Sequence, residues 1–176
     1  MTPKEGIVQR GKFELSERHV RDLFFALFDR QDFVTARTYW KDSSVDHFLA
    51  LGRSASGPDD LEAFFRSMHA AMPDLSMDIE SVVVSANRAV VQWRLRGTFD
   101  GAPFEGIEAT GRRVDLRGCD CFVWDEEGLV DENTVYYDGA AFARQIGLLP
   151  QQDSAGDRAI LGGFNLLTRV RKRLLR

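Results

Sequence analysis

The chain has 176 residues, of which 44% are hydrophobic and 28% charged, and its formal net charge is −4. This length and composition support one globular domain with a sizeable core, and the mild charge gives no electrostatic basis for nucleic-acid binding. The N-terminal sequence MTPKEGIVQRGKFEL lacks the apolar core of a signal peptide, and no apolar run is long enough to span a membrane. We therefore expect a cytoplasmic protein with reduced cysteines.

The first third of the chain has helical patterns. Ser16 is a suitable N-cap, and apolar residues then recur at helical spacing over residues 20–28. Asp32 is a suitable cap for a second helix with the sequence FVTARTYW. A third helix is expected to begin at Gly57 and to end at Pro73. Because their apolar residues form stripes, we expect all three helices to pack on the core.

After the third helix the pattern changes to that of β-strands. Strands are expected over residues 78–84, 88–99, 112–124 and 128–137, with a tight hairpin at 125–128 between the last two. A short helix follows at 139–147. Helices followed by antiparallel strands predict an α+β fold, with the helices packed on one face of a curved sheet.

The two ends of the chain differ in composition from this domain. We expect an N-terminal extension at 1–15, the domain at 16–150, a linker at 151–158 and a basic amphipathic C-terminal helix at 159–176. We favour packing of this helix on its own domain or on a second subunit, with its basic face in solvent. The alternative is contact with an anionic membrane surface or with another partner.

Cys119 and Cys121 are the only cysteines and flank Asp120 in the sequence GCDCF. Residues two apart in a strand point to the same face, so both thiols lie opposite the aspartate. A zinc site needs about four ligands, and none of the histidines has a suitable spacing, so no metal site is expected. A disulfide across one intervening residue is strained, and two packed thiols remain the favoured interpretation.

Asp120 is the only ionisable residue on its face of the strand, which it shares with Val114, Leu116, Gly118, Phe122 and Trp124. A carboxyl among apolar side chains is costly unless it is paired, hydrogen-bonded or protonated, and its pKa is then usually raised. This makes Asp120 a candidate catalytic residue. The alternatives are that it pairs with a neighbouring Arg or Tyr, or that a bulge turns it outward.

The sequence SSVDHF at 43–48 provides a second candidate site. Asp46 and His47 are adjacent, so only one of them is expected to point inward. His47 would titrate near neutral pH and could act as a general base, or it could be an ordinary core histidine. In the last strand, Tyr136 and Tyr137 could line a cavity or simply be strand residues.

Several motifs resemble those of the SnoaL-like polyketide cyclases. They are PDL after the third helix, the sequence RGTFDGAPFEGIEATGRRV, the G-x-D-x-F strand and the closing RQIGLLP. The resemblance extends over about residues 16–150 and places the chain in the nuclear-transport-factor-2-like superfamily, with the ketosteroid isomerases and the limonene-epoxide-type hydrolases. It implies a cone-shaped, curved antiparallel sheet, wrapped by N-terminal helices around an apolar central pocket. It also implies a homodimer that uses no metal and no organic cofactor.

The resemblance extends to single residues. Asp120 falls where ketosteroid isomerases place the aspartic acid of the oxyanion hole, and Asp46 or His47 falls near their aspartate base. Phe24 stands near the position of the isomerase tyrosine and has no hydroxyl, which argues against steroid isomerisation. The sequence from Glu132 to Val135 replaces a cyclase strand of the type E-H-W-D, so the acidic group at its end is missing.

Two functions follow from these features. The first is cofactor-independent acid/base catalysis on a hydrophobic, carbonyl-bearing small molecule, of the cyclase or isomerase type, with Asp120, His47 and Asp46 as catalytic candidates. The second is a non-catalytic module of the same fold that binds a small molecule or a protein. The residues expected to line the pocket are Phe24, Phe28, Trp40, Trp93, Phe122, Glu132, Tyr136 and Tyr137.

Overall fold

The computed structural model describes residues 13–174, so most of the expected N-terminal extension and the last two residues of the tail lie outside the described residues. Two helices open the described chain, and the first continues as a π-helical turn at Phe25–Asp29. In chain order, the elements are α1 (Glu17–Phe24), α2 (Phe33–Arg37), β1 (Trp40–Phe48), β2 (Arg53–Ser56), α3 (Gly57–Ala71), β3 (Ser76–Ser85), β4 (Arg88–Phe99), β5 (Arg112–Trp124), β6 (Val130–Tyr137), α4 (Gly139–Ile146) and α5 (Ala155–Leu174).

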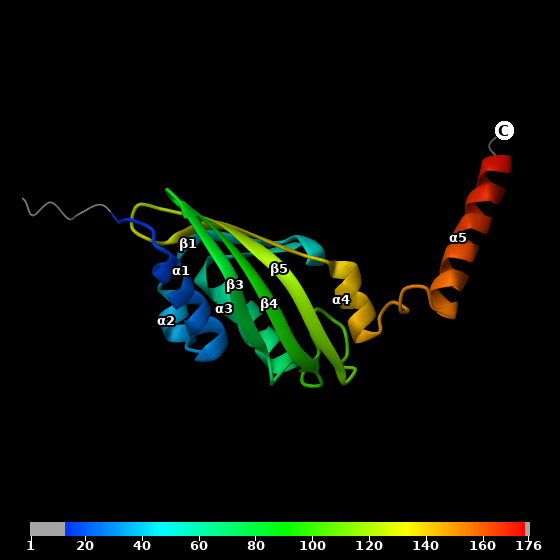
Figure 1. Cartoon of the computed structure of the whole chain (residues 1–176), viewed down its shortest axis with the longest axis horizontal. Helices are drawn as coiled ribbons and strands as arrows, with labels where there is room; N and C mark the ends of the chain where they lie inside the picture. Colours follow the sequence, from blue (N-terminus) through cyan, green and yellow to red (C-terminus); the bar gives the residue numbers. More distant parts are fainter. Residues whose placement is uncertain (1–12, 175–176) are drawn as a thin grey trace, which may run out of the picture.

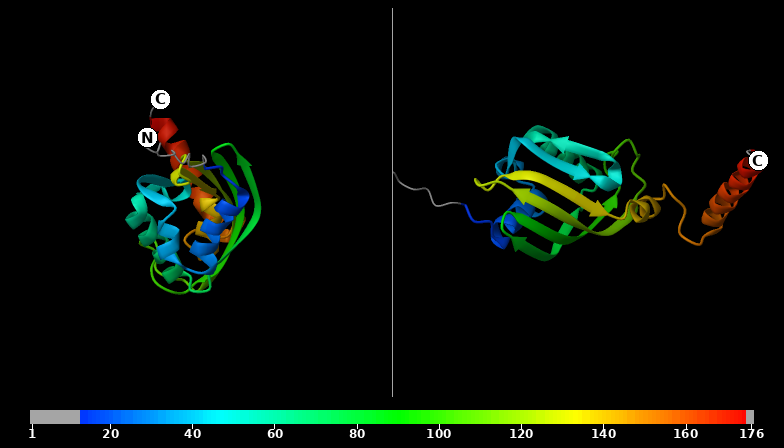
Figure 2. Two further views of the ribbon diagram at one scale, coloured as in Figure 1. Left: turned by 90° about the vertical axis from the view of Figure 1, so that its left-hand side faces the viewer. Right: turned by 90° about the horizontal axis from the view of Figure 1, so that it is seen from above.

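The strands form one sheet in the order β2-β1-β6-β5-β4-β3. All neighbouring pairs are antiparallel except β1 and β6, which run parallel. The sheet is strongly curved, and α1, α2 and α3 cover its concave face (Figures 1 and 2). This arrangement confirms the predicted α+β fold with helices on one face of a curved sheet.

The predicted helix caps and the predicted bounds of β4 and β5 are confirmed. Ser16 Oγ accepts the backbone N–H of His19 at 3.2 Å, and Asp32 Oδ1 accepts that of Thr35 at 3.0 Å. Strands β4 and β5 occupy the predicted residues 88–99 and 112–124, because their alternating apolar residues face the helices. Gly147 ends α4 with φ of 84°, a left-handed conformation that favours glycine.

The second helix was predicted too long, and neither β1 nor β2 was predicted as a strand. Helix α2 ends at Arg37, and Trp40 already pairs with Val130 of β6. The register of β1 then shifts between Trp40 and Val45, and Ser44 Oγ donates to the Val130 carbonyl at 2.5 Å within this irregularity. The polar sequence KDSS has little strand propensity, so nothing in its local pattern predicts a strand. The bond from Ser44 to β6 helps to hold this segment in the sheet instead.

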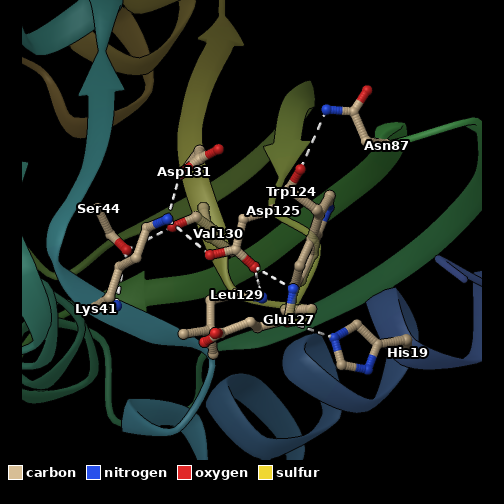
Figure 3. Close-up of polar contacts among 11 residues, drawn as sticks. His19, Lys41, Ser44, Asn87, Trp124, Asp125, Glu127, Leu129, Val130 and Asp131 are labelled. Carbon is tan, nitrogen blue, oxygen red and sulfur yellow. Dashed lines mark hydrogen bonds and ion pairs between the residues drawn. The ribbon is translucent and has the colours of Figure 1, made fainter. Parts of the chain in front are cut away.

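A cluster of charged side chains fastens the hairpin between β5 and β6 to β1 (Figure 3). We call Lys41, Asp125 and Asp131 the hairpin cluster. Lys41 Nζ lies 2.7 Å from Asp125 Oδ2 and 2.5 Å from Asp131 Oδ1. Asp125 Oδ1 also accepts the backbone N–H groups of Glu127 and Leu129, each at 2.9 Å. The carboxylate of Asp125 therefore closes the turn, while the lysine joins the turn to β1.

Helix α5 stands away from the rest of the protein (Figures 1 and 2). None of its 20 residues is buried, so it does not pack on its own domain, and the expected alternative of packing on a second subunit stays a prediction. It begins at Ala155, inside the segment predicted as a linker, because Ser154 Oγ accepts the backbone N–H of Asp157 and caps its first turn. Within residues 13–174, no helix combines the length and the apolar character needed to cross a bilayer.

Candidate functional site

A pocket with a cavity volume of about 70 Å³ lies between the concave face of the sheet and the helices. Its lining is almost entirely apolar. The lining residues are Phe28, Phe48, Leu51, Phe64, Phe65, Met68, Met72, Met77, Trp93, Leu95, Phe104, Leu116, Asp120, Val135, Tyr137 and Phe142. Only Trp93, Asp120 and Tyr137 among them carry a polar side-chain atom, so the pocket suits a hydrophobic molecule with few polar groups.

Asp120 reaches the pocket because of the strand parity that the sequence predicted. Strand β5 pairs with β4 in a register that places Gly118 opposite Trp93. A Cβ atom at Gly118 would lie 2.3 Å from the Trp93 ring, so the indole lies across the strand in the space that glycine leaves. From there Trp93 Nε1 donates a hydrogen bond of 2.9 Å to Asp120 Oδ1. The glycine of the G-x-D sequence thus makes the contact between Trp93 and Asp120 possible.

A second carboxyl group lies beside Asp120. The parallel register of β1 and β6 places Asp46 opposite Asn133, and both side chains are almost fully buried, at 2% and 1% exposure. Asn133 Nδ2 donates to Asp46 Oδ2 at 2.9 Å and to Asp120 Oδ2 at 3.3 Å. One amide therefore bridges two carboxyl groups from different strands. We call Asp46 and Asp120 the carboxyl pair and Asn133 their bridging amide.

Both carboxyl groups bind their protons more tightly than a free aspartic acid. Burial raises the pKa of Asp46 to about 7, and the nearby negative charge of Asp120 adds to the effect, while the bond from Asn133 opposes it. Burial raises the pKa of Asp120 to about 6, against the opposing bonds from Trp93 and Asn133. No cation balances either group among its hydrogen-bond partners. The pair therefore keeps a proton at higher pH than free aspartic acid does.

The structure places His47 outside the site. Asp46 points inward, and its neighbour His47 points to the outer face, as expected for adjacent strand residues. His47 Nδ1 lies 2.8 Å from Ser54 Oγ, and His47 Nε2 lies 3.6 Å from Glu132 Oε1. These contacts hold the imidazole near solvent and away from the pocket lining. The acid/base candidates that share one site are therefore Asp46 and Asp120.

The predicted lining residues fall into three groups. Phe28, Trp93 and Tyr137 line the pocket. Phe24, Trp40 and Phe122 are buried in the core but are not among the lining residues. Tyr136 and Glu132 point to the outer face, with exposures of 49% and 55%, because the inward positions of β6 are Asn133, Val135 and Tyr137.

The two cysteines lie on the outer face of β5, opposite Asp120. Both thiols are free, their Sγ atoms are 3.7 Å apart, and burial raises the pKa of Cys119 to about 11. A thiol with such a pKa stays protonated and has little nucleophilic character. Within residues 13–174, no three side chains of the His, Cys, Asp or Glu type gather as a metal site would require.

Asn133 is the functional candidate that the sequence did not single out. It shares inward parity with Val135 and Tyr137, and a polar amide at such a position needs a buried partner. That parity was visible in the sequence. The register that sets Asn133 beside Asp46 was not, because it depends on the pairing of β6 with an unpredicted strand.

Comparisons with known proteins agree with this architecture. A family model for the SnoaL-like polyketide cyclases matches residues 18–146, whereas no curated protein matches the sequence. Solved structures with the same fold include TsrD from Streptomyces laurentii, which is 26% identical, with a TM-score of 0.66 over 77% of this chain and 100% of its own.

Two further structures resemble the chain at lower identity. A protein from Jannaschia sp. CCS1, described as a SnoaL-like polyketide cyclase, is 24% identical, with a TM-score of 0.63 over 78% of this chain and 99% of its own. A Catenulispora acidiphila protein with a ketosteroid isomerase-like fold, solved with trimethylamine, is 13% identical, with a TM-score of 0.62 over 76% of this chain and 95% of its own. Since the family model covers most of the sequence, the chain belongs to the SnoaL-like polyketide cyclase family.

Proposed function

We propose that the pocket binds a hydrophobic molecule with a carbonyl group and that Asp120 moves a proton on that molecule as general acid and base. One observation carries this proposal. A single carboxyl group projects into a largely apolar pocket, and a buried amide connects it to a second carboxyl group. An apolar site with one carboxyl of raised pKa suits proton transfer near neutral pH.

The hydrogen bonds of Asp120 favour its role as a base. Both of its oxygens accept an N–H group, Oδ1 from Trp93 and Oδ2 from Asn133, and such bonds stabilise the ionised form. Asp46 accepts only one such bond, and its Oδ1 atom has no partner among the described residues, so the ionised form is better stabilised on Asp120 and the proton on Asp46. This role replaces the oxyanion-hole donor that the resemblance to isomerases implies for Asp120.

In the proposed reaction, Asp120 both removes and returns the proton. Asp120 takes a proton from the carbon next to the carbonyl, and the electrons of the broken C–H bond move onto the carbonyl oxygen as an enolate. Protonated Asp120 then returns the proton to another carbon in an isomerisation, or to the alkoxide oxygen that forms when the enolate carbon closes a ring. Because the proton is taken and returned by one group, the cycle needs no cofactor.

Tyr137 is the group best placed to stabilise the enolate oxygen. It lines the same pocket as Asp120, and its hydroxyl makes no hydrogen bond to another described residue. Burial raises the pKa of Tyr137 to about 12, so the hydroxyl keeps its proton and remains a donor. A donor directed at a developing oxyanion typically contributes roughly 3–4 kcal/mol to catalysis.

A non-catalytic binding module is the second candidate function. The observation in its favour is the composition of the pocket, in which Asp120 is the single titratable carboxyl among the lining residues and Asp46 lies behind the wall. In this case Asp120 would orient a ligand, without a proton transfer step.

Exchange of carbon-bound protons separates the two functions. A panel of hydrophobic cyclic ketones and 1,3-diketones is incubated with the protein in heavy water, and loss of the α-proton signal is followed by NMR. Binding is followed in parallel by the change in tryptophan fluorescence, to which Trp93 in the pocket contributes. We expect exchange faster than in buffer, and a fall of about 10²- to 10⁴-fold in Asp120→Asn.

The control is Asp131→Asn, which makes the same chemical change in the half-exposed part of the hairpin cluster and should leave exchange unchanged. Two outcomes would contradict the enzymatic proposal. In the first, a compound binds in the pocket but its α-proton exchanges at the buffer rate, which identifies a binding module. In the second, Asp120→Asn exchanges the proton as fast as the unmodified protein.

A further inference from the structure

We propose that α5 binds the surface of an anionic phospholipid membrane, with its apolar face in the boundary between headgroups and acyl chains. The helix is joined to the domain after α4 and does not border the pocket. The inference is therefore independent of the chemistry of Asp120, and either proposal can fail alone.

The apolar face of α5 is long and uncovered. Ile160, Phe164, Leu167 and Leu174 follow one another at spacings of four, three and seven residues, which places them on one side of a helix. Arg171 lies on the same side, seven residues after Phe164 and three before Leu174, so this face carries one cation near its C-terminal end. Their exposures are 55%, 65%, 72% and 81%. Side chains of this size are rarely left together in water without a partner surface.

The opposite face of α5 is basic. Arg158, Arg169 and Lys172 follow at spacings of eleven and three residues, and Arg173 flanks them. Residues 155–176 contain six Lys or Arg and one Asp, so their formal charge is +5 and that of the remaining chain is −9. The one acidic residue, Asp157, lies 3.9 Å from Arg144 of α4 and is not available to a partner.

This combination fits an anionic lipid surface better than a second copy of the helix. Two α5 helices packed through their apolar faces would bring their basic flanks together, and no acidic residue lies between Arg158 and Leu174 to pair with them. A membrane surface provides an apolar layer next to phosphates. Long Arg and Lys stems can lie along the helix while their charged ends reach those phosphates.

The acidic body of the protein strengthens the assignment to α5. A surface of negative lipids repels a body of charge −9, so attachment has to come from the basic helix. We therefore expect attachment to depend on both faces of α5, the apolar face for insertion and the basic face for attraction.

Flotation of the full-length protein with vesicles tests this inference. We expect binding to vesicles of phosphatidylcholine mixed with phosphatidylglycerol, little binding to phosphatidylcholine alone, and weaker binding at high salt. Neutralising two cations in Arg169→Gln with Lys172→Gln should lower the partition coefficient about thirtyfold, from roughly fivefold per cation. Phe164→Ser should abolish the flotation, whereas Val34→Ser, at an exposed apolar residue on α2, should not change it.

Three results would overturn the inference. The first is that the full-length protein does not float with the anionic vesicles. The second is equal binding to both kinds of vesicle without dependence on salt, which would remove any role for the basic face. The third is a dimer in light scattering without lipid that Phe164→Ser converts to a monomer, because a second copy would then cover the apolar face.

Discussion

The carboxyl groups of the hairpin cluster and those of the pocket wall differ in whether a cation lies beside them. In the hairpin cluster, Asp125 and Asp131 contact Lys41, whose charge balances theirs (Figure 3). In the pocket wall, Asp46 and Asp120 contact only neutral donors, the amide of Asn133 and the indole of Trp93. The carboxylates of the hairpin cluster are therefore balanced by a cation, whereas the carboxyl pair is stabilised only by the dipoles of neutral N–H donors.

The pKa values move in opposite directions as a result. Burial alone would raise the pKa of Asp125, but the bonds from Lys41 and from the backbone of Leu129 and Glu127 hold it below its ordinary value. Burial raises the pKa of Asp46 and Asp120, and neutral donors offset only part of that rise. A carboxyl with a cation stays ionised and holds the fold together, whereas one without a cation can exchange a proton near neutral pH.

Removal of the bridging amide should give the largest change in stability. Asn133→Leu leaves two buried carboxyls without a shared donor, so at pH 7 we expect a loss of about 3–5 kcal/mol in the free energy of unfolding. The loss should be smaller at pH 4, where both carboxyls are protonated. Chemical denaturation at the two pH values measures both quantities.

The matched control is Asn87→Leu, which removes a single bond of 3.1 Å from an amide to the carbonyl of Trp124 beside the hairpin. It should cost about 1 kcal/mol with no dependence on pH in this range. Equal losses for the two variants at both pH values would show that the amide of Asn133 is not bonded to charged groups.

The pH dependence of stability should differ between the two regions. The pKa of Asp120 is raised in the folded state, so the folded protein binds the extra proton and stability falls as pH rises from about 4 to about 7. A shift from 3.8 to about 6 corresponds to a decline on the order of 3 kcal/mol. Asp120→Asn should remove this share of the decline in denaturation curves recorded across the range, whereas the share from Asp46, whose pKa is also raised, should remain.

Asp125 should show the opposite sign. Because its pKa is lowered in the folded state, its contribution is present above the unfolded value and is lost as pH falls further. Asp125→Asn should therefore reduce stability at neutral pH and leave it unchanged in strong acid. If Asp120→Asn and Asp125→Asn change the pH dependence of stability in the same direction, the distinction between the two regions is wrong.

Filling the space at Gly118 should have a moderate effect. Gly118→Ala places a Cβ atom 2.3 Å from the Trp93 ring and 2.6 Å from the backbone oxygen of Tyr136, so both the indole and the neighbouring strand must move and the bond to Asp120 is lost. We expect a cost of about 1–3 kcal/mol and a further rise in the pKa of Asp120, because a donor to its ionised form has gone. Gly162→Ala in α5, where no atom lies within 4 Å, should not change domain stability.

The smallest effect is expected at Lys41. Lys41→Gln removes the cation of the hairpin cluster, and the pKa of Asp125 should rise toward its ordinary value. Since the lysine is 30% exposed, the cost in stability should be about 1 kcal/mol or less. The pH dependence of the carboxyl pair should be unchanged, and a change there would mean that the two regions are coupled.

The sequence predicted the parts of the fold that have regular patterns. Ser16 and Asp32 cap the helices where expected, and β4 and β5 have the predicted bounds because their apolar residues alternate. Strand β1 was missed because the sequence KDSS is polar and its irregular pairing depends on a bond from Ser44 to β6. The local sequence pattern therefore predicts elements whose apolar residues alternate or recur regularly. It does not predict elements whose formation depends on partners far away in the sequence.

The site was predictable to a similar extent. The isolated position of Asp120 on an apolar strand face pointed to it directly, and the structure confirms that it faces the pocket. The choice between Asp46 and His47 depended on the facing of β1, and the role of Asn133 depended on the register between β1 and β6. Both are long-range properties of the sheet that no local pattern in the sequence contains.

Direct titration of the two buried carboxyls tests the central claim. Carboxyl carbons of labelled aspartate are followed by NMR between pH 3 and pH 9, with Asp46→Asn and Asp120→Asn used for assignment. We expect two raised transitions, with pKa values of about 7 for Asp46 and about 6 for Asp120, and a transition for Asp125 below its ordinary range. If Asp46 and Asp120 both titrate like free aspartic acid, the pair holds no proton near neutral pH and the proposed acid/base chemistry is wrong.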